Sequence, residues 1–319
     1  PTRRSSDLNT SRYLCWQDQL DRPDEVQSVS PPQPRPPVVA RPRRLSVTQI
    51  EAWMRNPYSI YARHILRLRP VKPLDEDPSA ADYGQFIHRA LDAFLMSVAP
   101  GPLPADATAR LVEIGRAELA QQEDRPSVRA FWWPRYLRIA HWFIATEADR
   151  REVAETLACE VEGELVFQAP AGPFVLSARA DRIDRLRDDN GLVVIDYKTG
   201  KPPPEKEIKA GFAPQLPLEA EMVRLGAFPG VPAARVAALE FWHLHGKIDG
   251  GERCRRIKDA DVLEVCEDAL AGVRNLVADF DLGETPYLAR PRVSMAPKYD
   301  DYEHLARVRE WSAGAETDT

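Results

Sequence analysis

Runs of apolar side chains predict a set of β-strands in the middle of the chain. Apolar and polar residues alternate across 157–167, which predicts a strand with one buried face. Residues 192–195 are all apolar, as in a strand that is buried on both faces. The sequence before this run ends in Asn190-Gly191, a strong hairpin signal. We therefore predict a β-hairpin from Ala178 to Gly200, and a further strand at 234–244.

Apolar residues at helical spacing predict helices before, between and after these strands. Ser46 is followed three residues later by Gln49, a pair that caps helix N-termini, and it indicates where the first helix begins. The predicted helices span 46–55, 57–68, 80–98, 105–122, 127–150, 213–225 and 260–280. This order predicts an α/β fold with a mixed central sheet flanked by helices, a helical N-terminal part and a helical insertion.

The N-terminal region differs from the rest of the chain. Residues 31–37 are mostly proline, which fixes φ and has no N–H donor, so we predict an extended linker. We interpret 9–44 as the end of a preceding domain with this linker, and 45–319 as one folded domain. Pro1 to Leu8 resembles a translated sequencing adaptor, and we interpret it as a non-native segment. Because the chain starts with Pro1, we expect a fragment of a longer protein.

Composition limits the classes of protein to which the chain can belong. A hydrophobic content of 44% in 319 residues supports a substantial core, and no apolar run has the length of a membrane helix. Nothing suggests secretion, so we expect a cytoplasmic protein. A net charge of −6 excludes a globally basic nucleic-acid binder, and any contact with DNA must come from local basic patches. Candidates are Arg63, Arg67, Arg69 and Lys72, then Arg179, Arg182, Lys198, Lys201, Lys206 and Lys209.

The predicted hairpin carries the candidate chemistry. Strand side chains alternate between two faces, so Asp196 and Lys198 share one face at the end of an apolar strand. Asp181, on the neighbouring strand, can converge on them. Two carboxylates and a lysine around one point suit a hard divalent cation and the water that it activates. The strand at 157–167 offers further carboxylates on a face that we assign to solvent, with the alternative that one helps to hold the metal: Glu160, Glu162 and Glu164.

The spacing of these residues resembles a known nuclease signature. Fourteen residues separate Asp181 from Asp196-Tyr197-Lys198, as in the PD-(D/E)XK nucleases. Three segments are similar to the RecB-like branch of that superfamily: Gly84 to His88, Ala180 to Asp184 and Ile195 to Gly200. From Leu45 to the C-terminus, the chain resembles in particular the C-terminal nuclease domain of the AddB family. The resemblance implies a PD-(D/E)XK nuclease domain at 45–319.

The resemblance also implies a role for each motif residue. Asp181 and Asp196 would bind a divalent metal ion, Mg²⁺ or alternatively Mn²⁺. His88 would add an imidazole ligand, and the backbone carbonyl of Tyr197 would complete the shell. Lys198 would orient the attacking water or stabilise transition-state charge. The catalytic residues would therefore be Asp181, Asp196 and Lys198.

Substrate contacts are expected around this centre. RecB-like nucleases often carry a Gln with a Tyr four residues later, and this chain has Gln215 with Glu219 in the place of the Tyr. We predict that Gln215, Arg179 and Lys201 bind substrate.

The cysteines do not predict a metal centre. None of Cys15, Cys159, Cys254 and Cys266 belongs to a Cys-X-X-Cys pair, which argues against a zinc site. Some AddB relatives hold an iron–sulfur cluster with one early cysteine and three near the C-terminus. Here the early position is Asn56, and no cysteine follows Thr285. We therefore expect no iron–sulfur cluster.

The motifs together predict a Mg²⁺-dependent deoxyribonuclease, expected to be an exonuclease, in an AddB-like helicase-nuclease subunit. Such a subunit would act in double-strand break repair and recombination. Its partners would be DNA and an AddA-like helicase-nuclease subunit, without a membrane. The alternative is a non-catalytic DNA-binding or scaffolding module of the same complex. The intact Asp181, Asp196 and Lys198 argue against that alternative, because an inactive domain is free to lose them.

Overall fold

The computed structural model of the chain describes residues 5–20, 29–71, 78–120, 126–297 and 299–315. These form two compact units, one of Pro1–Pro32 with Tyr302–Thr319 and one of Gln33–Asp301. The first unit contains the helices α1 (Ser5–Leu20) and α10 (Val308–Ala315). Every candidate site residue lies in the second unit. The predicted domain boundaries at residues 9 and 45 stay predictions.

The second unit is built around a six-stranded mixed sheet. β1 runs parallel to β3 and β4 runs parallel to β5, whereas β2–β3, β3–β4 and β5–β6 are antiparallel. The predicted hairpin is formed by β3 and β4, and Asn190 in its turn has a φ of 56°, a left-handed conformation that Asn tolerates. The strands are β1 (Arg44–Ser46), β2 (Ala154–Ala169), β3 (Gly172–Leu186), β4 (Leu192–Lys198), β5 (Val236–His243) and β6 (Glu252–Cys254).

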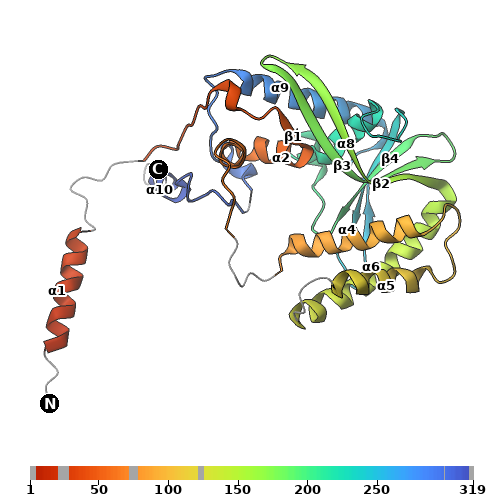
Figure 1. The fold of residues 1–319 in the computed structure, drawn as a ribbon, viewed down its shortest axis with the longest axis horizontal. Helices are drawn as coiled ribbons and strands as arrows, with labels where there is room; N and C mark the ends of the chain where they lie inside the picture. The colour runs from red at the N-terminus through yellow and green to blue at the C-terminus, as the bar shows by residue number, and fades with distance from the viewer. Residues whose placement is uncertain (1–4, 21–28, 72–77, 121–125, 298, 316–319) are drawn as a thin grey trace. The chain divides into compact units, whose positions relative to one another are not determined.

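Helices cover both faces of this sheet, which confirms the predicted α/β fold (Figure 1). One face is covered by α4 (Ala80–Ser97), α5 (Ala107–Ala120) and α6 (Pro126–Val153). The other is covered by α2 (Val47–Arg55), α8 (Gln215–Arg224) and α9 (Val262–Asp281). Shorter elements complete the unit: η1 (Val38–Ala40), α3 (Pro57–Ile60), η2 (Tyr61–Ile65), α7 (Glu205–Lys209), η3 (Asp259–Asp261) and η4 (Val293–Met295).

The central strand β4 divides the core into two clusters. Val193, Ile195 and Tyr197 pack against the α4–α6 layer, whereas Leu192 and Val194 pack against the α2–α8–α9 layer. This alternation is the period of two that a strand imposes on its side chains.

Local capping explains where α2 begins. The hydroxyl of Ser46 accepts a hydrogen bond from the backbone N–H of Gln49 at 3.2 Å, and the backbone N–H of Ser46 donates to the Gln49 side chain at 2.9 Å. This reciprocal capping box confirms the predicted helix start. Among the residues that the structure describes, no helix combines the length and the apolar character needed to span a membrane.

Candidate metal-dependent active site

His88 reaches the end of β4 from helix α4. Gly84, one turn earlier, lies against the segment that follows β4, where an added Cβ would be 3.3 Å from Oγ1 of Thr199. A small residue therefore lets α4 approach this segment closely. Nε2 of His88 lies 2.8 Å from the carbonyl oxygen of Tyr197, so residues 109 positions apart in the chain meet at one point.

A group of metal-binding side chains surrounds the other nitrogen of this ring. Nδ1 of His88 is 3.4 Å from Oδ1 of Asp181 and 3.7 Å from Oε1 of Glu160. The three residues each offer one ligand atom, all within 4.8 Å of one another. Oδ2 of Asp181 accepts the backbone N–H of Tyr197 at 2.8 Å, which fixes the carboxylate against β4. One imidazole and two carboxylates at this spacing suit a hard or borderline divalent cation.

Glu160 joins this group because its backbone leaves the regular strand conformation. Its φ is 46°, in the left-handed region that a non-glycine residue rarely adopts and that costs about 1–3 kcal/mol. Glu162 and Glu164 are exposed, as predicted, but the Glu160 side chain is only 14% exposed. The assignment of Glu160 to the solvent face is therefore wrong, since this kink turns it inward. Nε of Arg179 holds it in place, 2.6 Å from Oε2.

A second group continues the site along β4. Oδ1 of Asp196 accepts hydrogen bonds from Nζ of Lys198 at 2.9 Å and from Nε2 of Gln215 at 3.0 Å. Nζ of Lys198 also donates to Oε1 of Gln215 at 3.0 Å, and Nε2 of Gln215 donates to Glu219 at 3.1 Å. The remaining oxygens, Oδ2 of Asp196 and Oε2 of Glu219, are buried and have no hydrogen-bond partner in the part of the chain that the structure describes. Buried polar atoms are seldom left in this state, and a site built for a ligand is one reason for it.

The two groups form one electrostatic unit, called the carboxylate cluster here: His88, Glu160, Asp181, Asp196, Lys198, Gln215 and Glu219. Burial and the charge of Asp181 raise the pKa of Asp196 to about 6, although Lys198 opposes this shift. Burial, with the charges of Asp196 and Asp181, raises the pKa of Glu219 well above its usual range. Burial opposes charge on His88, but hydrogen bonds with Asp181 and Glu160 outweigh it and raise the pKa of His88 to about 10. Carboxylates thus destabilise one another here.

The residues of the carboxylate cluster fit a divalent cation. Mutual repulsion among the acids, the unpartnered oxygens and the imidazole facing two carboxylates would each be relieved by a positive ion. Asp181 and His88, both predicted ligands, lie in the three-residue group. Asp196 lies beside it in the Lys198–Gln215 group, and the Tyr197 carbonyl is engaged by His88. That these residues bind a metal stays a prediction.

Comparison with known proteins identifies the family. A model of the PD-(D/E)XK nuclease superfamily matches residues 44–293. The chain belongs to the PD-(D/E)XK nuclease superfamily. Members of this superfamily are generally nucleases that use divalent metal ions.

The curated relatives are longer proteins of unknown role. An uncharacterized protein of Rickettsia bellii is 32% identical over 187 residues, which is 59% of this chain and 22% of the relative. One of Rickettsia felis is 29% identical over 231 residues, 72% of this chain and 26% of the relative. The chain thus spans about a quarter of their length. The crystal structure of SSO0001 aligns over 82% of this chain and 85% of its own at 14% identity, but its TM-score is only 0.26.

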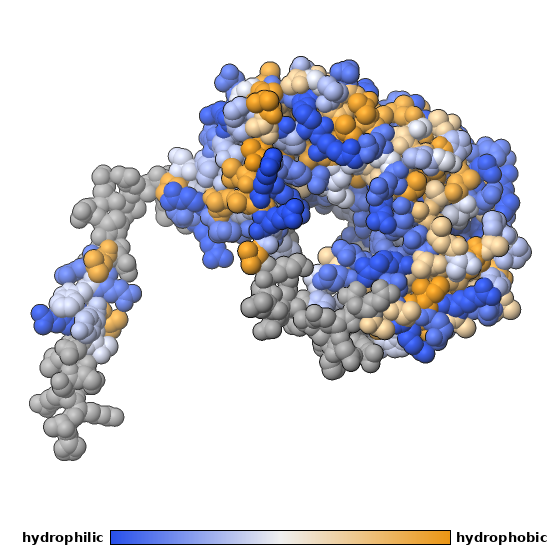
Figure 2. Space-filling model, viewed as in Figure 1, coloured by the Kyte–Doolittle hydropathy of each residue, from blue (hydrophilic) through white to orange (hydrophobic). Residues whose placement is uncertain are grey.

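The basic residues expected at the substrate lie in different surroundings within this PD-(D/E)XK domain. Arg179 is 60% exposed beside Glu160, and Lys201 is exposed just after β4. Arg182 is buried, so the expectation that it belongs to a DNA-contacting patch is wrong. Lys72 lies outside the described residues. Figure 2 shows a hollow near the centre of the visible face of the second unit, bordered in part by hydrophilic residues.

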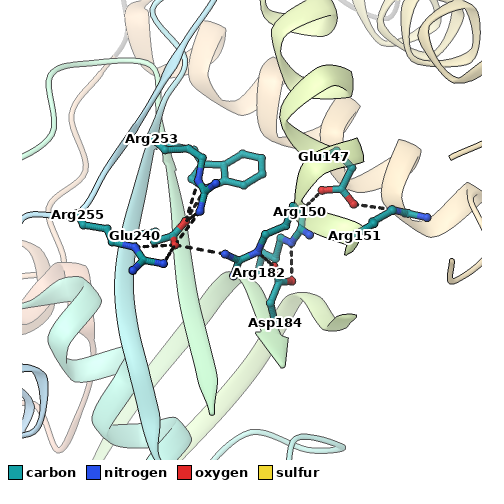
Figure 3. A network of polar contacts seen from close by, with 9 residues as sticks. Glu147, Arg150, Arg151, Arg182, Asp184, Glu240, Arg253 and Arg255 are labelled. Carbon is teal, nitrogen blue, oxygen red and sulfur yellow. Dashed lines mark hydrogen bonds and ion pairs between the residues drawn. The ribbon is translucent and has the colours of Figure 1, made fainter. Parts of the chain in front are cut away.

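Arg182 belongs to a second polar cluster, with a buried centre and an exposed rim, called the arginine network here: Glu147, Arg150, Arg151, Arg182, Asp184, Glu240, Arg253 and Arg255 (Figure 3). Arg150 of α6 donates to Asp184 of β3 at 2.8 Å and to Glu240 of β5 at 3.3 Å. Arg182 donates to Asp184 at 2.6 Å and to Glu147 at 2.5 Å. This network ties helix α6 to the sheet.

Every carboxylate of the arginine network faces at least one guanidinium. Arg253 and Arg255 both donate to Glu240, at 3.1 and 2.7 Å, and Arg151 pairs with Glu147 at 2.7 Å. Although burial opposes it, the charge of Arg150 with the bonds from Arg253 and Arg255 lowers the pKa of Glu240 to about 2. Sequence reasoning missed this network, because charged residues in a strand are ordinarily assigned to its exposed face.

Proposed function

We propose that this domain is a metal-dependent deoxyribonuclease that hydrolyses phosphodiester bonds, with Mg²⁺ as its ion. The observation that carries the proposal is the carboxylate cluster, in which Asp196 and Glu219 are both buried and each has one carboxylate oxygen without a hydrogen-bond partner among the described residues. In a cluster with a purely structural role, each buried acid would be paired with a cationic side chain, as in the arginine network. An uncompensated cluster is suited to a cation and a substrate that arrive later.

Three residues would hold the ion: His88, Glu160 and Asp181. Asp196 would assist from the adjacent strand. When bound, the ion would neutralise charge on the phosphate and lower the pKa of a coordinated water.

Lys198 would act on the phosphate or on the attacking water. Its ammonium has three N–H donors, of which two bind Asp196 and Gln215. The side chain is 32% exposed, so the remaining donor is accessible to a substrate. The charge of Asp196 raises the pKa of Lys198 despite burial, which keeps the ammonium protonated and able to stabilise negative charge.

Gln215 would position both groups at once. Its amide accepts from Lys198 and donates to Asp196 and Glu219, so its orientation fixes the relative placement of the Lys198 ammonium and the two carboxylates. Glu219 occupies the place where RecB-like nucleases often have a Tyr, and it holds the Gln215 amide from the far side.

The wider setting is proposed by resemblance to the AddB family. In that setting the domain would be part of an AddB-like subunit, act as an exonuclease in cytoplasmic double-strand break repair and recombination, and work with an AddA-like helicase-nuclease subunit.

Cleavage of end-labelled linear DNA, with Mg²⁺ or with EDTA, tests the proposed function. Wild-type protein should cleave only with Mg²⁺, and Asp196→Ala should lower the rate at least about a hundredfold. Asp268→Ala, an exposed acid on α9, is the matched control and should cleave normally. An exonuclease should spare closed circular DNA. DNA binding without cleavage would favour the scaffolding alternative, and normal cleavage by Asp196→Ala would refute the site.

A further inference from the structure

A cavity of about 660 Å³ opens beside Thr199, the residue that follows Lys198 of the carboxylate cluster. It lies at the C-terminal ends of the parallel strands β4 and β5, where Lys198 and His243 are aligned and the N–H of Leu244 donates to the carbonyl of Lys198 at 2.7 Å. Its walls come from the segment after β4, from helix α6 and from the segments around β6. The lining side chains that matter here are Lys201, Arg135, Arg138, Lys247 and Arg256.

The wall between α6 and the β5–β6 loop is rigidly built. Arg135 donates to the carbonyl of His245 at 3.0 Å, and Arg138 donates to the carbonyl of Gly246 at 2.8 Å. Gly246 has a φ of 63°, and a Cβ there would be 2.9 Å from Cβ of Arg135. A Cβ on Gly250, with a φ of 80°, would overlap the carbonyl oxygen of Arg138. Glycine is required at both positions, since the loop backbone packs directly on the helix.

The cavity concentrates positive charge in an acidic protein. Five of its lining side chains are cationic, against the single carboxylate of Glu252, which pairs with His243 at 2.9 Å. Lys201 and Lys247 are exposed and form no ion pair with any residue that the structure describes. Nε of Arg256 is buried and has no hydrogen-bond partner among those residues. Because the whole chain has a net charge of −6, this concentration of positive charge is a local feature of the cavity and not a property of the whole surface.

We propose that this cavity binds backbone phosphates of the DNA strand, next to the phosphodiester that the carboxylate cluster cleaves. Guanidinium and ammonium groups are the usual ligands of nucleic-acid phosphates. A strand whose phosphate lies at Lys198 would continue past Thr199 and Lys201 into the cavity, because Thr199 follows Lys198 in the chain and lines the cavity together with Lys201. The inference rests on the proposed nuclease function and names where its substrate lies.

Salt-dependent DNA binding by the full chain tests this proposal separately from cleavage. Binding of fluorescent oligonucleotides would be measured by anisotropy in EDTA, with single-stranded and duplex DNA as two arms. The variant Lys201→Ala/Lys247→Ala removes two cavity charges without removing an ion pair or a side-chain hydrogen bond of the described structure. The control Arg187→Ala/Arg235→Ala removes two exposed charges beside the β3–β4 turn, at the opposite end of β4 and β5.

The cavity variant should bind several-fold more weakly, and its slope of log affinity against log salt should fall by about 1.4 with single strands or about 1.8 with duplex. The control should keep the wild-type slope. A loss in either arm supports the cavity and identifies the form of DNA that enters it. Equal slopes for wild type and cavity variant in both arms, an equal loss in the control, or no wild-type binding would overturn the proposal. Wild-type protein that binds DNA with the expected salt dependence but does not cleave it with Mg²⁺ would count against the nuclease function alone.

Discussion

The carboxylate cluster and the arginine network are two polar regions on the same sheet, and the pKa values of their buried acids are shifted in opposite directions. Both use residues of β3, since Asp181 belongs to the first and Arg182 to the second. In the arginine network the pKa of Glu240 is lowered to about 2, because guanidinium groups surround it. In the carboxylate cluster the pKa of Asp196 is raised to about 6. Asp181 and Arg182 are adjacent in one strand, yet Arg182 lies in the cluster that binds the sheet to α6, and Asp181 lies in the cluster that we propose as the active site.

This contrast shows how a structural charge can be told from a functional one. Burial desolvates both regions, so burial alone does not separate them. The two regions differ in whether each buried ion has a partner of opposite charge. A buried ion with such partners helps to hold one fold, whereas a buried acid without them destabilises the fold until a ligand binds. The strained backbone of Glu160 lies in the uncompensated region, as expected where strain serves a function.

The largest expected effect comes from breaking the arginine network. Arg182→Ala would leave Asp184 and Glu147 short of a buried partner, and removing one member of a buried ion pair costs about 3–5 kcal/mol. Urea unfolding should therefore show a strongly destabilised or unfolded protein. Arg185→Ala, in the same strand, breaks only a half-exposed pair with Glu155 and should cost about 1 kcal/mol or less. Similar losses of stability in both variants would show that the arginine network contributes no more than an exposed ion pair.

Neutralising Asp196 should raise the stability of the folded protein, whereas Arg182→Ala should lower it. The folded-state pKa of Asp196 is raised to about 6, so its contribution to stability is complete below the unfolded pKa of about 4 and is lost as pH rises through about 6. Asp196→Asn avoids that loss and should stabilise the metal-free protein at pH 8 by about 3 kcal/mol. The gain should shrink steadily toward pH 4.

Thermal unfolding in EDTA across this pH range measures the effect. Asp268→Asn, an exposed acid on α9, should show little change at any pH. A destabilised Asp196→Asn at pH 8 would mean that Asp196 is a compensated structural charge like those of the arginine network.

The smallest expected effect concerns His88. If its imidazole helps to hold the ion, His88→Ala should raise the Mg²⁺ concentration for half-maximal cleavage by about tenfold, which is about 1.4 kcal/mol. Added Mg²⁺ should restore part of the rate, because Glu160 and Asp181 remain. His141→Ala, an exposed histidine on α6, should behave as wild type. An unchanged midpoint with a lower melting temperature would make His88 a packing residue.

The sequence predicted those features that depend on local periodicity. The apolar run of β4 fixes which side chains share a face, so Asp196 and Lys198 were correctly placed together. Ser46 and Gln49 likewise determine the start of α2 through contacts three residues apart. The spacing between Asp181 and Asp196 reflects a hairpin, whose register is set by its own turn.

Features that depend on distant contacts or unusual backbone geometry were not predictable in this way. The left-handed φ of Glu160 has no signature in an alternating strand, so the inward turn of its carboxylate could not be read. Arg150 binds Asp184 and Glu240, which are 34 and 90 residues away in the sequence, and no local sequence pattern predicts such pairs. The strands β1 and β6 have three residues each, too few for a periodic signal.

Calorimetric titration with Mn²⁺ tests most directly whether the carboxylate cluster is built for a cation. Wild-type protein should bind Mn²⁺ and release a proton near neutral pH, because the pKa of His88 is raised to about 10 and a metal ligand must be deprotonated. Asp181→Asn should weaken binding at least about tenfold, while Asp268→Asn should not. Absence of binding to wild-type protein, or equal binding to Asp181→Asn, would contradict the account.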